Sequence, residues 1–174
     1  TRTYKCHNEE NGKLSVVTSD GTYIFTPYSS KIIETMFVPE GEEMSYKSHA
    51  VVMPYNDSIG SYSYVGKEIS FSTKGIAVTI TTEPFNVNYT YKGKDLVSEG
   101  TGFKDRDSLK TISLNITKEE VLYGAGARAL GMNRRGKRLP LYNRAHYGYE
   151  TYSEQMNFAI PIVISSNKYL VHFD

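Results

Sequence analysis

Apolar side chains recur at every second position in several short runs of the chain. Isoleucine and valine alternate with small or polar residues over 76–80, and a similar alternation runs through 85–91 and 112–116. A period of two is typical of β-strands, because successive side chains of a strand point to opposite faces of the sheet. The pattern therefore predicts antiparallel strands with one buried and one solvated face.

Turn-forming residues separate these runs and predict hairpins. Ser19-Asp20-Gly21 lies between runs at 13–17 and 22–25, and Asp-Gly readily adopts the positive φ angles of a tight turn. Further turns are expected at 72–75 and 92–95, and further strands at 31–38, 48–53, 69–71, 158–164 and 169–173. Many short strands with regular turn signals indicate an all-β fold in which two antiparallel sheets pack as a sandwich.

One segment carries a helix-start signal. Thr117-Lys118-Glu119-Glu120 has the form of a capping box, in which the threonine caps a free amide and the last glutamate reaches back to it. Gly124 and Gly126 follow at once and would end a helix quickly. We therefore expect one short helical turn near residues 117–123 in an otherwise all-β domain.

Composition supports this class and restricts function. The chain has 174 residues, 15 of them Tyr, which suits one strand-rich domain spanning 1–174. A formal net charge of +1 provides no overall basic field, and no apolar run reaches the roughly 18 residues of a membrane span, so we expect neither nucleic acid nor membrane as partner. The single Cys6 excludes an internal disulfide. A (β/α)8 barrel, which needs roughly 200 residues or more, is excluded by length.

Patterns that carry enzyme chemistry are weak in this chain. The histidines are not spaced as metal ligands, and no G-x-S-x-G nucleophile motif occurs. Adjacent carboxylates such as Glu119 and Glu120 would face opposite ways on a strand and cannot act together on one glycosidic bond. Residues 124–129 match the letters of a dinucleotide fingerprint, but the strand-to-helix context is missing, so we interpret them as a tight corner between strands. We expect no catalytic residue, metal or cofactor.

Residues 142–152, called the tyrosine loop below, combine four tyrosines with an asparagine, an arginine and a histidine around one glycine. Aromatic faces stack on a pyranose ring, while amide, guanidinium and phenol groups hydrogen-bond its hydroxyls. The candidate sugar-binding residues are Tyr142, Asn143, Arg144, Tyr147 and Tyr149. Composition leaves open the alternative that the loop packs against a neighbouring domain.

A basic run overlaps this loop. No acidic residue occurs from Tyr123 through Tyr149, whereas arginines and lysines are frequent there. A stripe that binds nucleic acid would raise the pI of the domain well above 7.7. We interpret the run as a solvated face or as an interface to acidic groups of another domain, with Arg128, Arg134 and Arg135 as candidate interface residues.

Several motifs occur in an order that resembles a known family. They are Leu122-Tyr123-Gly124-Ala125-Gly126-Ala127-Arg128-Ala129, Asn133-Arg134-Arg135-Gly136, Leu141-Tyr142-Asn143 and the two apolar segments 158–164 and 169–174. Together they resemble the N-terminal, galactose-mutarotase-like β-sandwich domain of glycoside hydrolase family 31, which contains α-glucosidases, α-xylosidases and α-glucan transferases. The resemblance covers residues 117–174, whereas residues 1–116 are similar only in being rich in strands.

The chain departs from the family pattern at three places: an acidic residue is replaced by Ala127, a tryptophan by Tyr142 and a loop aspartate by Ala145. Without that aspartate, Arg144, Tyr147 or Tyr149 is expected to shape the sugar site instead. The loop is similar to that of the branch that includes oligosaccharide 4-α-glucosyltransferases.

The resemblance implies a retaining mechanism whose two catalytic aspartates lie on barrel loops outside this domain. It implies a non-catalytic domain, excised from a larger enzyme, that packs on its own catalytic barrel. The tyrosine loop would then contribute to the subsite for the leaving-group or acceptor sugar, and an oligosaccharide would bind weakly. Related enzymes are often exported, so a periplasmic or extracellular parent is expected. A free-standing carbohydrate-binding module and a structural or adhesive sandwich without ligand remain alternatives.

Overall fold

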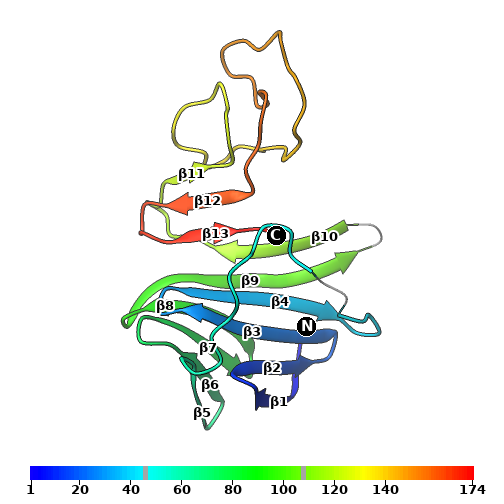
Figure 1. Cartoon of the computed structure of the whole chain (residues 1–174), viewed down its shortest axis with the longest axis vertical. Helices are drawn as coiled ribbons and strands as arrows, with labels where there is room; N and C mark the ends of the chain where they lie inside the picture. The colour runs from blue at the N-terminus through cyan, green and yellow to red at the C-terminus, as the bar shows by residue number, and fades with distance from the viewer. Residues whose placement is uncertain (45–46, 107–108) are drawn as a thin grey trace. The chain divides into compact units, whose positions relative to one another are not determined.

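The computed structural model describes residues 1–44, 47–106 and 109–174. Within these ranges the secondary structure consists of β-strands, and no helix is present. The chain divides into two compact units, Thr1–Ile116 and Thr117–Asp174, which are described separately (Figure 1). The organisation of 1–174 as a single domain stays a prediction. Within the described ranges, no helix has the length and apolar character needed to cross a membrane.

The first unit consists of two antiparallel sheets built from consecutive hairpins. The four-stranded sheet has the order β1-β2-β3-β4, with β1 (Tyr4–Glu10), β2 (Lys13–Thr18), β3 (Gly21–Ser29) and β4 (Ile32–Pro39). The six-stranded sheet has the order β10-β9-β8-β7-β6-β5, with β5 (Ser61–Val65), β6 (Glu68–Ser72), β7 (Ile76–Thr82), β8 (Phe85–Tyr91), β9 (Lys94–Arg106) and β10 (Leu109–Asn115). Each strand therefore pairs with its neighbour in sequence.

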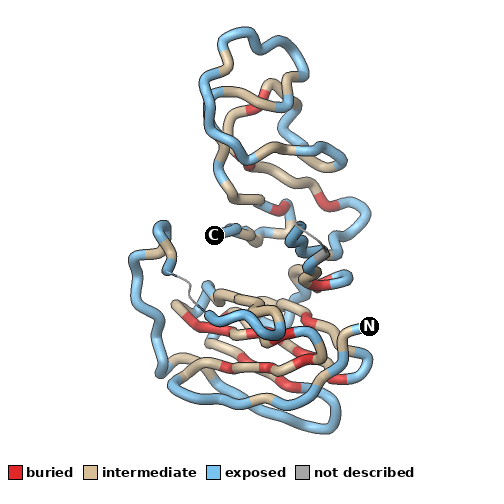
Figure 2. The backbone as a smooth tube through the Cα atoms, turned by 90° about the vertical axis from the view of Figure 1, so that its right-hand side faces the viewer, coloured by how far each residue is buried: buried red, intermediate tan, exposed pale blue. Residues whose placement is uncertain are grey.

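The hydrophobic core of this unit is formed by residues of both sheets. The four-stranded sheet contributes Leu14, Val16, Tyr23 and Phe25, and the six-stranded sheet contributes Ile69, Phe71, Val78, Ile80 and Val87. Buried and partly buried positions alternate along β2, as they do along other strands in Figure 2. The expected all-β sandwich of two packed antiparallel sheets is confirmed.

Both hairpins expected at Ser19-Asp20-Gly21 and at residues 92–95 are present, but only the second has a turn with positive φ angles. Thr18 pairs with Gly21 across the β2–β3 hairpin, so Ser19 and Asp20 are the central residues of that turn and neither has a positive φ. Lys92 and Gly93, with φ angles of 49° and 78°, connect β8 to β9. Positive φ at both central residues matches the right-handed twist of the flanking strands, which is why such turns close hairpins.

The strand expected at residues 48–53 is wrong. The hydroxyl of Ser48 accepts hydrogen bonds from the amides of Ala50 and Val51 at 3.1 and 2.7 Å, which forms a local turn. Val52 is 95% exposed. The short apolar run therefore pairs with no strand. Conversely, sequence periodicity did not indicate β1, β5 or the long strand β9.

The second unit contains a three-stranded antiparallel sheet of order β11-β12-β13, with β11 (Leu122–Gly124), β12 (Ile162–Ser165) and β13 (Leu170–His172). Ile164 pairs with Leu170, which confirms the terminal hairpin predicted from sequence, but its first strand begins at Ile162 and not at residue 158. Residues 125–161, which the structure describes throughout, contain neither helix nor strand. This long connection carries the tyrosine loop.

The short helical turn expected near residues 117–123 is also wrong. The amide of Glu120 bonds to the carbonyl of Thr117 at 3.3 Å, which closes a single turn before β11 begins. The Glu120 carboxylate does reach back, accepting the Thr117 amide at 2.9 Å. Its other oxygen accepts hydrogen bonds from the hydroxyls of Ser165, at 2.6 Å, and Tyr169. Contacts with the β12–β13 hairpin thus hold the capping pair without a helix.

Candidate functional site

The tyrosine loop presents its aromatic rings to solvent. Tyr142, Tyr147, Tyr149 and Tyr152 are 63%, 95%, 49% and 75% exposed. Figure 2 shows that most of the connection between β11 and β12 is exposed. Aromatic side chains gathered on a surface indicate a binding or interface region, because their apolar faces gain free energy when they are covered.

The backbone of the loop, in contrast, is held by hydrogen bonds. The Asn143 side-chain oxygen accepts the amide of Ala159 at 2.5 Å, and Gln155 donates from its side chain to the Tyr142 carbonyl at 2.9 Å. The His146 amide donates to the side chain of Asn157 at 3.1 Å. These bonds tie the loop to residues 155–159. Asn143 therefore fixes the loop, while its contact with a sugar stays a prediction.

A shallow, open hollow lies beside the loop, lined by Ala129, Tyr149, Glu150 and Thr151. It combines an aromatic ring, a carboxylate and a hydroxyl, which are the groups that stack on a sugar and bond to its hydroxyls. Ligand pockets usually enclose most of their ligand. Because the hollow is open, its residues would cover only one side of a bound sugar, and their contact with a sugar stays a prediction.

The corner at Gly124-Ala125-Gly126 begins the connection after β11. All three residues have positive φ, at 104°, 62° and 85°. A Cβ atom on Gly124 would collide with the Ile162 carbonyl oxygen, and one on Gly126 would lie 2.7 Å from the Ala159 Cα. The interpretation of this motif as a closely packed corner is confirmed, and no helix follows it that could receive a pyrophosphate.

The three candidate interface arginines, Arg128, Arg134 and Arg135, donate to backbone carbonyls of their own unit. Arg134 bonds to the carbonyls of Gly124, Leu130 and Gly131 at 3.4, 3.2 and 2.9 Å. Arg135 bonds to the carbonyls of Thr117 and Glu120 at 2.6 and 3.0 Å. Both side chains thus organise the loop after β11. Their role at an interface with another domain stays a prediction.

Arg128 is the most buried of these arginines and is 8% exposed. Its guanidinium donates to the carbonyls of Ala125, Pro140 and Glu154. Burial, together with the charge of Arg134, lowers the pKa of Arg128. The carbonyl dipoles rather than a carboxylate satisfy this buried cation. Sequence reasoning found Arg128 in the basic run but not its partners, two of which lie 12 and 26 residues away.

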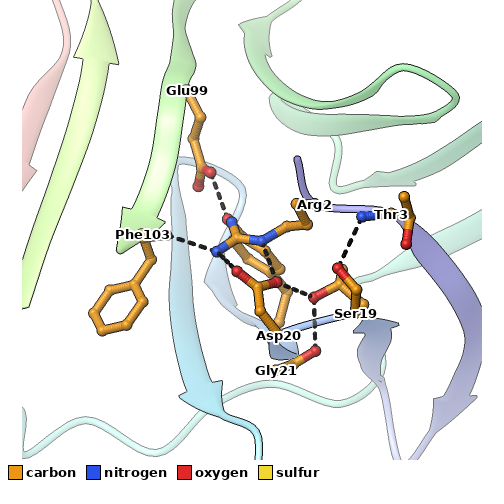
Figure 3. A network of polar contacts seen from close by, with 9 residues as sticks. Arg2, Thr3, Ser19, Asp20, Gly21, Glu99 and Phe103 are labelled. Carbon is orange, nitrogen blue, oxygen red and sulfur yellow. Dashed lines mark hydrogen bonds and ion pairs between the residues drawn. The ribbon is translucent and has the colours of Figure 1, made fainter. Parts of the chain in front are cut away.

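A second polar cluster, which sequence patterns did not indicate, lies in the first unit (Figure 3). Arg2 forms two hydrogen bonds with the Asp20 carboxylate, at 2.7 and 2.9 Å, and one with the Phe103 carbonyl at 2.6 Å. Arg2 also bonds to the Tyr23 hydroxyl, which donates to Glu99. The Glu99 side chain is buried, and in the described part of the chain its Oε1 atom has no hydrogen-bond partner. The Tyr23–Glu99 hydrogen bond in this cluster connects the two sheets.

In the described ranges, no three His, Cys, Asp or Glu side chains are grouped so that they could hold a metal ion.

Comparison with known protein families gives one match. The family model described as the glycosyl hydrolase 31 N-terminal galactose mutarotase-like domain matches residues 22–174. The match includes residues 22–116 of the strand-rich first unit and the whole second unit, which carries the tyrosine loop. A search of curated proteins found no match.

Solved structures of longer chains contain the same fold. A GH31 dextranase of Flavobacterium johnsoniae, solved with glucose, superposes with a TM-score of 0.88 at 18% identity, covering 99% of this chain and 22% of that one. The cycloalternan-forming enzyme of Listeria monocytogenes, solved with a pentasaccharide substrate, gives 0.78 at 16% identity over 98% of this chain and 17% of that one. A GH31 α-xylosidase of Xanthomonas citri gives 0.71 at 20% identity over 96% of this chain and 19% of that one. The chain thus spans about a fifth of the length of these enzymes.

Proposed function

Since the chain belongs to the family of glycosyl hydrolase 31 N-terminal galactose mutarotase-like domains, we propose that it is the non-catalytic N-terminal domain of an α-glucosidase or α-glucan glucosyltransferase. In this role it packs on the catalytic barrel of the same enzyme. The barrel supplies both catalytic carboxylates. The tyrosine loop supplies part of the subsite for the leaving-group or acceptor sugar.

The observation that carries this proposal is the combination of exposed rings with a held backbone in the tyrosine loop. Tyr147 is 95% exposed and Tyr149 is 49% exposed, while hydrogen bonds through Asn143 and Gln155 tie the loop down. A pre-ordered loop loses little conformational entropy when a ligand binds, so more of its contact energy contributes to affinity. Such a loop suits a flat ligand with one apolar face, as a pyranose has.

The open shape of the site favours a shared subsite over a free-standing binding module. The hollow beside Tyr149 has one wall, lined by Ala129, Glu150 and Thr151 as well. A second wall from a catalytic domain would enclose the sugar and complete its hydrogen bonds. Two of the similar enzymes were solved with glucose and with a pentasaccharide substrate, which supports an α-glucan as the ligand class.

The test is made in the full-length enzyme that carries this domain. Tyr147→Ala and Tyr149→Ala should each lower kcat/KM on longer maltooligosaccharides about tenfold, because one lost sugar contact is worth about 1 to 2 kcal/mol. A small aryl α-glucoside, which barely occupies the acceptor side, should lose less. Tyr55→Ala, an exposed tyrosine of the first unit, serves as the control. Normal kinetics of both loop variants on every chain length would show that the loop only packs between domains.

A further inference from the structure

We propose that Arg128 is the positioning residue of the tyrosine loop, because its one guanidinium group holds both ends of the loop at once. The Nη2 atom donates to the Pro140 carbonyl and the Nη1 atom to the Glu154 carbonyl, both at 2.6 Å. Pro140 precedes the tyrosine loop, residues 142–152, and Glu154 follows it, each separated from it by one residue. The distance between the two ends is therefore set through a single side chain.

A third anchor fixes the position of Arg128 itself. Its Nε and Nη2 atoms donate to the Ala125 carbonyl at 3.1 and 2.9 Å. Ala125 is the middle residue of the corner after β11, where Gly124 and Gly126 both have positive φ. The corner presents the Ala125 carbonyl toward the guanidinium and is itself packed against Ile162 and Ala159. Arg128 thus connects both ends of the loop to the corner that follows β11 of the three-stranded sheet.

The next residue along the chain continues this closure at the far end of the loop. The Ala129 amide donates to the Ser153 carbonyl at 3.2 Å, and the Ala129 carbonyl accepts the Tyr152 amide at 2.8 Å. Tyr152 has a φ of 70°, so the chain reverses there. Arg128 and Ala129 together hold the two ends of the loop in place by hydrogen bonds.

The contacts require an arginine. A planar guanidinium has five donors in a fixed fork, so it can bond to carbonyls of three segments simultaneously, whereas an ammonium group is a compact point charge with no such geometry. Arg128 is buried, so its donors must be satisfied by protein atoms. Arg128→Lys keeps the charge and removes the fork, which makes it the informative variant.

The direct test is hydrogen–deuterium exchange of the 174-residue chain. Arg128→Lys and Arg128→Met should speed amide exchange in residues 141–153 about tenfold or more, because the loop opens more often once its base is lost. Amides of the paired strands β11 and β12 should keep their protection. Arg138→Met, which replaces an exposed arginine of the same connection, should change neither region.

Two results would overturn the assignment. Unchanged exchange of residues 141–153 in both Arg128 variants would show that the loop does not depend on the guanidinium. An equal loss of protection in β11 and β12 would show that Arg128 stabilises the whole unit rather than positioning the loop. Lost protection in β11 and β12 that occurs in Arg128→Met alone would reflect unfolding of that variant. The second result therefore counts only if Arg128→Lys shows it as well.

The kinetic consequence rests on the proposed function and is measured in the full-length enzyme. Arg128→Lys should lower kcat/KM on long maltooligosaccharides more than on an aryl α-glucoside. In the Tyr149→Ala background it should add little, since both changes act through the same loop. If Arg128→Lys speeds exchange in the loop but both Arg128→Lys and Tyr149→Ala keep normal kinetics, the proposed function is refuted and the positioning role stays intact. Impaired Tyr149→Ala kinetics with normal exchange and kinetics in Arg128→Lys would refute the positioning role alone.

Discussion

The hydroxyl of Tyr23 donates a 2.6 Å hydrogen bond to the carboxylate of Glu99 and so joins β3 of one sheet to β9 of the other. Arg2 donates a hydrogen bond to the same hydroxyl. Burial nevertheless raises the pKa of Glu99, since the hydrogen bond from Tyr23 and the charge of Arg2 only partly offset the loss of hydration. The sandwich thus contains a buried acid whose pKa lies above its ordinary value.

Stability should therefore depend on pH through Glu99. The folded pKa is above the ordinary value of about 4.3, so the stabilising contribution is complete below that pH and is lost as pH rises through the folded pKa. Relative to Glu99→Gln, the wild-type chain should lose unfolding free energy as the pH rises from the ordinary glutamate pKa through the raised folded pKa of Glu99. Urea titrations followed by circular dichroism at several pH values measure this difference. Parallel pH profiles of the two proteins would contradict it.

Glu120 should show the opposite dependence. Burial alone would raise its pKa, but hydrogen bonds from Ser165, Tyr169 and Thr117 together lower it. The folded pKa is then below the ordinary value, so the stabilisation is present above that value and is lost as pH falls through the folded pKa. Glu120→Gln should cost about 1 to 3 kcal/mol at neutral pH and less in acid, because it replaces one acceptor oxygen in a buried network.

The matched control for this prediction is the neighbouring Glu119, which is exposed. Glu119→Gln should change the unfolding free energy by less than about 0.5 kcal/mol. Denaturation of both variants at pH 7 and pH 3.5 separates the effects. If Glu120→Gln costs no more than Glu119→Gln at pH 7, the network does not stabilise the second unit.

Any side chain at Gly124, in the corner after β11, should destabilise the second unit. Its φ of 104° is unfavourable for an L-residue, and an added Cβ would meet the carbonyl of Ile162. Gly124→Ala should therefore destabilise the second unit by about 1 to 3 kcal/mol. Gly131→Ala is the control, since nothing lies within 4 Å of its Cβ position. Equal unfolding temperatures of the two variants would contradict the packed corner.

The isolated 174-residue chain should bind maltooligosaccharides no more tightly than about 1 mM, or about −4 kcal/mol. The hollow at Tyr149 has one wall and covers too little of a sugar to offset the loss of its freedom. Isothermal titration calorimetry with maltooligosaccharides of increasing length gives the dissociation constant. Micromolar binding would make a free-standing carbohydrate-binding module the better interpretation.

The sequence by itself determined the local part of the fold. Alternation over 76–80 and 85–91 predicted β7 and β8 because a period of two reports directly which face of a strand is buried. Asp20-Gly21 and Lys92-Gly93 predicted hairpins because turn geometry depends on neighbouring residues only. The ordered motifs of the second unit likewise indicated the family that the family model matches.

Only the tertiary structure decided which polar groups meet. The capping pair of Thr117 and Glu120 was visible in sequence, but Ser165 and Tyr169, which lie 45 and 49 residues beyond Glu120, hold it in a turn instead of a helix. Glu99 lies in β9, which lacks a clear period, and its partner Tyr23 is 76 residues away. Arg128 looked like one cation of a basic run, yet its donors reach carbonyls 12 and 26 residues away. Such contacts depend on how loops close and sheets pack, and a pattern of neighbouring residues contains no information about partners that distant chain segments supply.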